Sequence, residues 1–203
     1  MNIAERVKNI LLKPKSEWQI IASETTTTGE LYRSYIIPLA AIGPIASIIG
    51  MSLVGISMPF MGTYHVPLSM SIAHAVVSYT LTLISVYVVS LIINALAPTF
   101  SGEKDGIQAL KVAAYSSTAA WLAGIFALIP VLSLLGLVGL YSLYLLYLGL
   151  PMLMKAPQEK ALIYTVVVVI SAIVIFFIVG AISNVFISYP SSTMHMPGMP
   201  GIR

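Results

Sequence analysis

Residues Val166–Ile182 read VVVVISAIVIFFIVGAI, and this stretch decides the class of fold. It holds thirteen Val, Ile and Phe residues and no charged residue. At roughly −0.3 to −0.6 kcal/mol per residue, these side chains favour insertion into a bilayer by about 4 to 8 kcal/mol. The stretch therefore predicts a transmembrane helix, which we place at 161–188 together with its apolar flanks.

The rest of the chain has the same character. Of its 203 residues, 58% are hydrophobic and 8% are charged, and the mean hydropathy is +0.96. No charged residue lies in 34–102 or in 112–154. Both gaps exceed the roughly 20 residues that a helix needs to cross a bilayer. These values exclude a soluble globular fold and predict an all-α, polytopic membrane protein.

Five transmembrane helices account for the apolar segments of a domain spanning 34–188. We place them at 35–57, 71–97, 112–129, 134–150 and 161–188. Pro38 and Pro44 predict kinks in the first helix. The third and fourth segments are barely long enough, so they either cross fully as a tight hairpin or form a shorter re-entrant hairpin. Either arrangement returns the chain to the side that it left.

Residues 1–33 predict short amphipathic helices. Ile3, Val7, Ile10 and Leu11 fall on one helical face, and Pro14 ends that pattern. Ser16 with Gln19 resembles a capping box that opens a second helix. The two helices either lie flat on the lipid headgroups or pack on the bundle as a small folded cap.

A second capping box precedes the first transmembrane helix. Thr27 and Glu30 have the required spacing, so we expect a helix to begin there and to run into the bilayer.

The basic residues predict the orientation in the membrane. Nine of the ten Lys and Arg residues precede the first span or lie in alternate loops, and only Arg203 follows the last span. Because cytoplasmic loops carry the excess of Lys and Arg, we expect a cytoplasmic N-terminus and an outward-facing C-terminus. The expected location is the cytoplasmic (inner) membrane.

Several classes of function are disfavoured. The five spans contain no Asp, Glu, Lys or Arg, whereas ion-coupled pumps keep ionisable residues at membrane depth. Nucleotide-binding, metalloprotease and hydrolase motifs are absent, so we expect no enzyme and no catalytic residue. Cysteine is absent, and a net charge of +3 is too small to predict a nucleic-acid partner.

Polar side chains form a stripe on the second span. His74, Ser78, Thr82 and Ser85 are spaced by four, four and three residues and share one helical face. Further polar residues extend this lining, namely Tyr115, Ser116, Ser117 and Thr118 on the third span and Tyr141, Tyr144 and Tyr147 on the fourth. The stripe predicts either a polar groove for a headgroup, an ion or a small solute, or hydrogen bonds between helices worth about 0.6 kcal/mol each.

Histidines and methionines predict a candidate metal site on the outer side. The tail 189–203 is expected to be flexible, and its thioethers and imidazole suit Cu(I), whereas imidazoles alone suit Zn(II), Ni(II) or Cu(II). The alternative is an ordinary Pro/Gly-rich terminus with no cofactor. The candidate ligands are His65, His74, His195, Met194, Met196 and Met199.

Five residues expected on the cytoplasmic side form a candidate interface with a partner or with lipid. These residues either dock a soluble protein partner or anchor the chain to lipid headgroups. They are Trp18, Lys104, Lys111, Lys155 and Lys160.

Several short strings in the chain point to a known family. They are KVAAYS at 111–116, WLAGIF at 121–126, IP at 129–130, YSLYLLYLGLP at 141–151 and MKAP at 154–157, with RVKNIL at 6–11 and PKSEW at 14–18. With these strings the chain resembles the Yip domain, and within that group the bacterial inner-membrane branch. The resemblance implies five spans and a cytoplasmic N-terminus. In eukaryotic relatives it also implies binding of Rab-type GTPases and a part in vesicle trafficking, but the Asp-Leu-Tyr-Gly-Pro segment of those relatives is absent here.

Two hypotheses about function follow. The first is a non-enzymatic membrane protein that organises the membrane or binds lipid or protein partners, including a second copy of itself. The second is a transporter, channel or binding site for a metal ion or small solute that uses the polar stripe and the outward His and Met residues.

Overall fold

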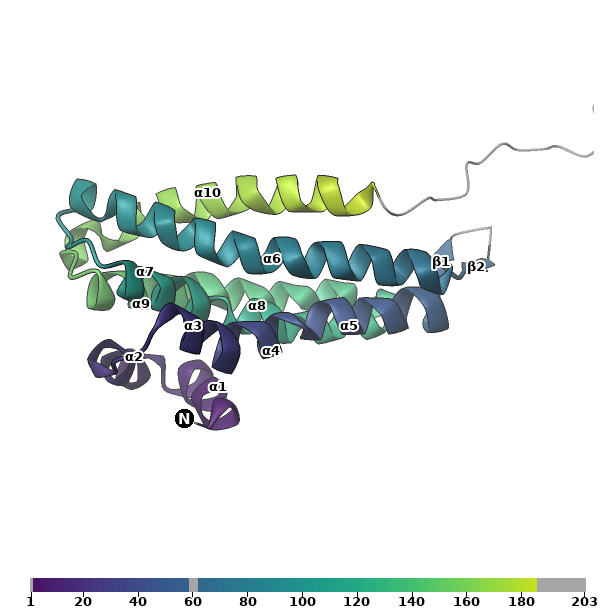
Figure 1. Ribbon diagram of the computed structural model, residues 1–203, viewed down its shortest axis with the longest axis horizontal. Helices are drawn as coiled ribbons and strands as arrows, with labels where there is room; N and C mark the ends of the chain where they lie inside the picture. The colour runs from purple at the N-terminus through teal and green to yellow at the C-terminus, as the bar shows by residue number, and fades with distance from the viewer. Residues whose placement is uncertain (1, 59–61, 186–203) are drawn as a thin grey trace, which may run out of the picture.

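The computed structural model describes residues 2–58 and 62–185 as a bundle of long helices laid side by side (Figure 1). In these ranges, four helical segments are long and apolar enough to cross a membrane: Thr28–Val54, Leu68–Phe100, Leu134–Leu153 and Gln158–Asn184. The expected class, an all-α membrane protein, is confirmed. The third expected span, 112–129, is helical but broken, so it does not count among these four.

Two short helices, α1 (Ile3–Leu12) and α2 (Pro14–Ser23), precede the bundle. Pro14 occupies the first turn of α2, where its missing N–H is not needed. The predicted capping box at Ser16 is therefore wrong, because Ser16 lies inside the helix and its hydroxyl donates to the carbonyl of Lys13 at 3.0 Å. Ile10, Trp18 and Ile21 are fully buried, so α1 and α2 form a folded cap on the bundle.

The first long helix has five parts: α3 (Thr28–Leu31), η1 (Tyr32–Ile36), α4 (Ile37–Ala40), α5 (Ile42–Ile49) and η2 (Gly50–Val54). The capping box at its start is confirmed, because Thr27 and Glu30 exchange both hydrogen bonds. The wide π-turn η1 ends next to Pro38, and a turn at Ala41 lies between the two prolines. Each proline removes one backbone hydrogen bond, which accounts for these interruptions.

A small hairpin follows at the opposite end of the bundle from α1 and α2 (Figure 1). Strands β1 (Ile56–Met58) and β2 (Gly62–Tyr64) pair antiparallel, with Ile56 opposite Tyr64. The first predicted span, 35–57, therefore ends earlier than expected, because its helix stops at Val54. Gly55 precedes β1 with φ of +83°, a conformation that glycine adopts readily.

The second long helix is α6 (Leu68–Leu96), followed by η3 (Ala97–Phe100). The third helical segment consists of α7 (Gly106–Ser116), α8 (Thr118–Ala123) and η4 (Gly124–Leu128), with a turn at Ser117. The chain returns through η5 (Pro130–Leu140) and α9 (Tyr141–Leu153).

Small residues bring the first and third segments into backbone contact. A Cβ built on Gly124 would lie 2.8 Å from the Cα of Gly43, and one on Gly50 would lie 2.0 Å from the carbonyl oxygen of Ala127. Close approach at small residues is the usual way in which helices pack inside a membrane. The broken segment therefore packs along the first long helix as part of the bundle.

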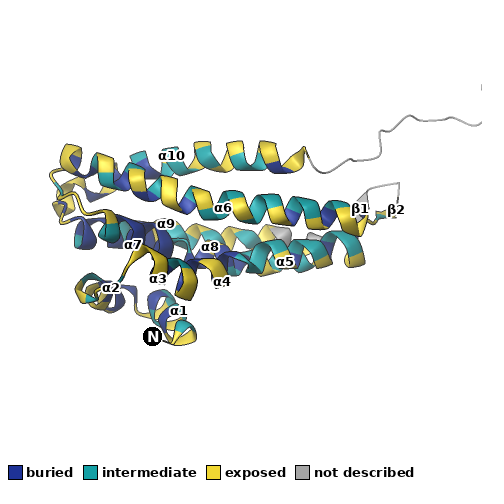
Figure 2. Cartoon of the chain, in the orientation of Figure 1, coloured by how far each residue is buried: buried dark blue, intermediate teal, exposed yellow. Residues whose placement is uncertain are grey.

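The last helix, α10 (Gln158–Asn184), is uninterrupted. It packs on α6 and α9, and Ala161, Tyr164, Thr165 and Val168 are buried. From residue 169 to residue 182 none of its residues is buried, and Figure 2 shows this half of the helix as exposed or intermediate. The first part of α10 is thus packed in the core, whereas most of its second part is exposed or half-buried.

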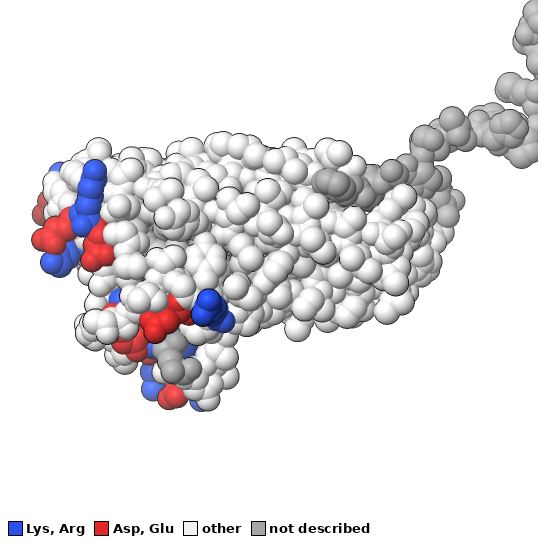
Figure 3. All heavy atoms as spheres, viewed as in Figure 1, with Lys and Arg blue, Asp and Glu red and all other residues white. Residues whose placement is uncertain are grey.

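Charged side chains gather at one end of the molecule. On the face drawn in Figure 3, Lys, Arg, Asp and Glu lie around α1 and α2 and at the left end of the bundle, and the other described atoms on this face are uncharged. This distribution matches a bundle that spans a bilayer, because the uncharged body can lie in lipid while the charged end lies in water.

Candidate functional site

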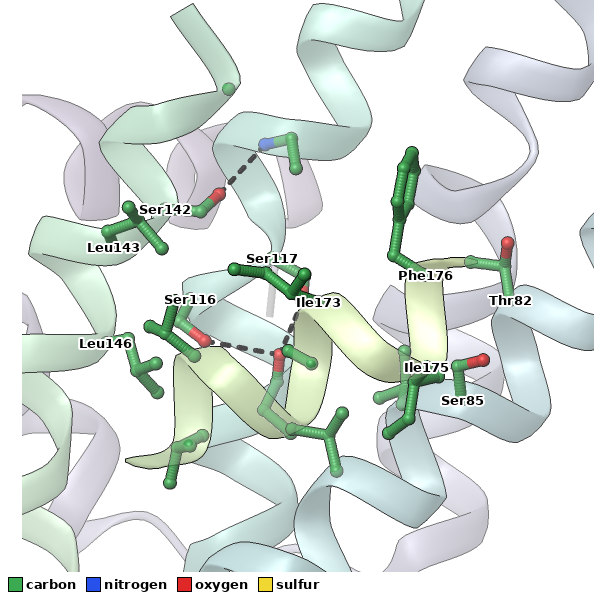
Figure 4. A pocket seen from close by; sticks show the side chains of 18 of the residues that line it. Thr82, Ser85, Ser116, Ser117, Ser142, Leu143, Leu146, Ile173, Ile175 and Phe176 are labelled. Atoms are coloured by element: carbon green, nitrogen blue, oxygen red, sulfur yellow. Dashed lines mark hydrogen bonds between the residues drawn. The ribbon is translucent and has the colours of Figure 1, made fainter. Parts of the chain in front are cut away.

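A cavity of about 390 Å³ lies among the helices of the bundle (Figure 4). Ligand pockets in proteins generally measure roughly 300–1,000 Å³. The lining comes from α6, α7, α8, η5, α9 and α10 and is mostly apolar, including Val86, Trp121, Leu146 and Phe176. Its polar residues are Thr82, Ser85, Ser116, Ser117 and Ser142.

The hydroxyl groups on α6 and α7 already donate hydrogen bonds to their own helices. Thr82 donates to the carbonyl of Ser78 at 2.8 Å, and Ser85 donates to that of Leu81 at 2.7 Å. Ser116 likewise donates to the carbonyl of Val112 at 2.6 Å. Because these donors are satisfied, the cavity needs no polar ligand, and its interior suits an apolar one.

Ser142 has a different role at the cavity wall. Its hydroxyl oxygen accepts a hydrogen bond of 3.0 Å from the backbone N–H of Ala120, drawn dashed in Figure 4. Ala120 lies in the first turn of α8, where backbone N–H groups lack a partner within the helix. Ser142 thereby stabilises the helix break after Ser117 and links α9 to α8.

The cavity is open on the side of α10. Ile173 and Phe176 both line it, and yet they are 47% and 72% exposed. Residues that border a cavity and remain exposed mark an opening. In a bilayer this opening would face lipid acyl chains, because it lies between apolar stretches of helix.

The polar stripe divides between two environments. Thr82 and Ser85 line the cavity, but Ser78 and His74 are not part of the lining. Ser78 donates to the carbonyl of Ala75 at 3.1 Å. His74 is half-buried, and its Nδ1 has no hydrogen-bond partner among the described residues.

The described residues offer no metal site. In 2–58 and 62–185, no three His, Cys, Asp or Glu side chains lie together in a way that could hold an ion. His65 is exposed, and its Nδ1 lies 3.2 Å from the carbonyl oxygen of Ser52. His195, Met194, Met196 and Met199 lie outside the described residues, so metal binding by the tail stays a prediction.

The residues expected at the cytoplasmic interface fall into two groups. Lys104 is exposed, and Lys155 and Lys160 lie at the surface, where Lys155 pairs with Glu103 at 2.6 Å and Lys160 donates to Ser101 at 2.7 Å. The expectation of an accessible interface at Trp18 and Lys111 is corrected, because these side chains are 0% and 2% exposed. They pack between the cap and the bundle, out of reach of a headgroup or a soluble partner.

A buried ionic cluster joins α1 to α2. The guanidinium of Arg6 forms ion pairs with Glu17 and Glu24, and the side chains of Arg6 and Glu17 are only 4% and 5% exposed. Burial alone would lower the pKa of Arg6, but the hydrogen bond that Arg6 donates to Glu24 and the charges of both glutamates raise it overall. Arg6 therefore stays charged at any physiological pH.

The same cluster fastens the cap to α7. The Arg6 guanidinium lies 5.7 Å from the ring centre of Tyr115, and Trp18 meets that ring edge-on at 6.3 Å. Lys111 donates to the carbonyl of Ile21 at 2.8 Å and to that of Glu24 at 2.5 Å. These contacts hold the cap against the bundle.

Comparison with known proteins gives one match. The family model of the Yip1 domain matches residues 8–181, which include most of the cap, all the cavity-lining residues and most of α10. No curated protein and no solved structure matches the chain.

Proposed function

The chain belongs to the Yip1 domain family, and from this premise we propose that it is a non-enzymatic protein that binds a lipid acyl chain. Its apolar helices make it a multi-pass membrane protein. The observation that carries the proposal is the cavity of about 390 Å³, apolar in its lining and open beside Phe176.

The chemistry of the lining favours an acyl chain over an ion or a polar solute. No Lys, Arg, Asp, Glu or His is among the lining residues, so nothing in the cavity neutralises a charge that has left water. An apolar cavity of roughly 150 Å³ already takes up a benzene-sized molecule. The larger space here suits part of an acyl chain that enters sideways from the bilayer.

We propose that this binding serves membrane organisation in the cytoplasmic (inner) membrane. A protein that holds a lipid chain between its helices can order the lipids around it and alter local packing. The exposed apolar half of α10, from residue 169 to residue 182, is the surface that we assign to contact with lipid or with a second copy. Lys104, Lys155 and Lys160 form the cytoplasmic surface available to a protein partner or to anionic headgroups.

We further propose five crossings, with a cytoplasmic N-terminus and an outward C-terminus. The broken segment α7–α8–η4 supplies the additional crossing, because it packs along the first long helix through Gly124 and Gly43. All Lys and Arg residues among 2–58 and 62–185 then lie on the cytoplasmic side, as the positive-inside rule requires.

Cysteine labelling tests this topology, since the chain has no cysteine of its own. With a membrane-impermeant maleimide, Leu132→Cys should react in intact cells, as should the outward control Thr63→Cys. Lys104→Cys should react only after permeabilisation. Labelling of Leu132→Cys only after permeabilisation, or not at all, would contradict a full crossing by α7–α8–η4.

Photocrosslinking tests the lipid site. A phospholipid with a diazirine in its acyl chain should label the cavity wall in reconstituted protein, and Ala172→Phe should reduce that labelling several-fold by filling the cavity. Val174 lies two residues away and does not line the cavity, so Val174→Phe is the matched control and should leave it unchanged. Equal labelling of the native chain and Ala172→Phe would refute the proposal.

A further inference from the structure

A second pocket, of about 270 Å³, lies where α3, α6 and α7 meet at the charged end of the bundle. It shares no lining residue with the acyl-chain cavity. Its lining residues are Thr28, Tyr87, Ser90, Leu91, Asn94, Asp105, Gly106, Ile107 and Leu110. Unlike the first cavity, it contains a charged group, the carboxylate of Asp105.

The polar groups of this pocket are mainly hydrogen-bond acceptors. Asp105 caps α7, and its Oδ1 accepts from the backbone N–H groups of Ile107 and Gln108 at 2.9 Å. Both bonds use the same oxygen, which leaves Oδ2 as a further acceptor. Ser90 donates its proton to the carbonyl of Tyr87 at 2.7 Å, so its oxygen also remains an acceptor.

Asn94 adds an unpaired acceptor in the last turn of α6. Its Oδ1 is buried and has no hydrogen-bond partner among the described residues. An unpaired buried amide oxygen is costly, and a donor bound in the pocket would remove that cost. The C-terminal end of a helix also carries partial negative charge. The pocket therefore favours a cation that donates several hydrogen bonds.

The surface beside the pocket is apolar. Ile84, Tyr87, Val88 and Leu91 follow each other at helical spacing on α6 and are 53%, 46%, 37% and 50% exposed. Tyr87 and Leu91 belong to both the pocket and this stripe. A polar pocket that continues into an apolar stripe matches an amphiphile whose head occupies the pocket and whose chain lies along α6.

We propose that this pocket binds the primary ammonium headgroup of an aminophospholipid, with Asp105 as the counter-charge and Ser90 and Asn94 as further acceptors. A primary ammonium offers three N–H donors, whereas a trimethylated ammonium offers none. The site thus discriminates between headgroups that carry the same positive charge but differ in their donors. It is independent of the acyl-chain cavity.

Lipid retention tests the proposal. The full chain is reconstituted into nanodiscs with equal amounts of phosphatidylethanolamine, phosphatidylcholine and phosphatidylglycerol, then extracted, and the retained lipid is identified by native mass spectrometry. We expect the native chain to retain phosphatidylethanolamine about tenfold over the other two, as a charge-assisted hydrogen bond implies.

Two variants address the site without disturbing the fold. Asp105→Asn keeps a good helix cap but removes the charge. Gly106→Leu fills the pocket, because a Cβ at Gly106 meets no heavy atom within 4 Å. Both should abolish the preference. The matched control is Gly180→Leu, at a position that is equally open, and both it and Ala172→Phe should retain the preference.

Equal retention of phosphatidylethanolamine and phosphatidylcholine by the native chain would overturn the proposal. So would an unchanged preference in Asp105→Asn and Gly106→Leu. A primary amine could come from a membrane lipid or from a water-soluble molecule, and soluble phosphoethanolamine, added as a competitor, distinguishes the two. It should leave the retained lipid in place, and displacement of the lipid would show that the site recognises a water-borne amine instead.

Discussion

Replacing Gly149 by alanine is expected to expel the Trp18 side chain from its place between the cap and the bundle. A Cβ at this position would lie 2.7 Å from Cζ2 and 2.8 Å from Cη2 of the Trp18 ring. The ring is rigid and fully buried, so it cannot yield by a small rotation. Overpacking together with loss of the buried indole should cost about 3 kcal/mol in the free energy of unfolding.

Two measurements follow the effect of Gly149→Ala. Thermal unfolding in detergent reports the loss of stability. Fluorescence reports the position of Trp18, because Trp18 and Trp121 are the two tryptophans of the chain. In a Trp121→Phe background, the emission of Trp18 should shift to the red. Gly180→Ala is the matched control, since its Cβ would meet no heavy atom. An unshifted emission in Gly149→Ala would contradict the packed cap.

Replacing Glu17 by leucine is expected to destabilise the cap by about 3 to 5 kcal/mol. Glu17 forms an ion pair with Arg6, and both side chains are at most 5% exposed. Removing one partner of a buried pair leaves the other charge poorly compensated, which costs far more than the pair itself contributes. The remaining glutamate of the cluster, Glu24, is 39% exposed and cannot replace the lost contact.

A double-mutant cycle separates the ion pair from simple loss of packing. The double variant Arg6→Leu with Glu17→Leu removes both charges, so it should be more stable than Glu17→Leu alone. The exposed pair of Lys155 with Glu103 is the control, and Glu103→Ala should leave the unfolding midpoint unchanged. Additive losses in the cycle would show that Arg6 and Glu17 are not coupled.

The fold class followed from hydropathy and charge spacing alone, because apolar segments of membrane length have few alternative folds. Hydropathy does not locate breaks within a segment. The turn at Ser117 depends on Ser142, which accepts from the N–H of Ala120 across 22 positions of sequence. A partner so distant leaves no local signal, and 112–129 therefore reads as one continuous helix.

The placement of the two N-terminal helices could not be decided from the sequence, for a similar reason. An amphipathic face with a tryptophan suits both a membrane surface and a protein surface. The deciding partner is Gly149, whose lack of a side chain admits the Trp18 ring. The sequence places these two residues far apart, so their contact could not be predicted from either one.

The candidate site was predictable in part. The helical spacing of Thr82 and Ser85 predicts that they share one face, and both line the cavity together with Ser116 and Ser117. His74 and Ser78 share that face by spacing, but they come one to two turns before Thr82 in α6 and do not line the cavity. Spacing determines the helix face on which a side chain lies. It does not determine the position along the helix at which neighbouring helices move apart and leave a cavity.

Quenching of Trp121 by brominated acyl chains tests the central claim most directly. Trp121 lines the cavity and is only 9% exposed, and bromine quenches tryptophan only on contact. In a Trp18→Phe background reconstituted with brominated phospholipid, we predict strong quenching of Trp121 that Ala172→Phe abolishes. Quenching that is absent from the native cavity, or that persists unchanged in Ala172→Phe, would contradict an acyl chain bound between these helices.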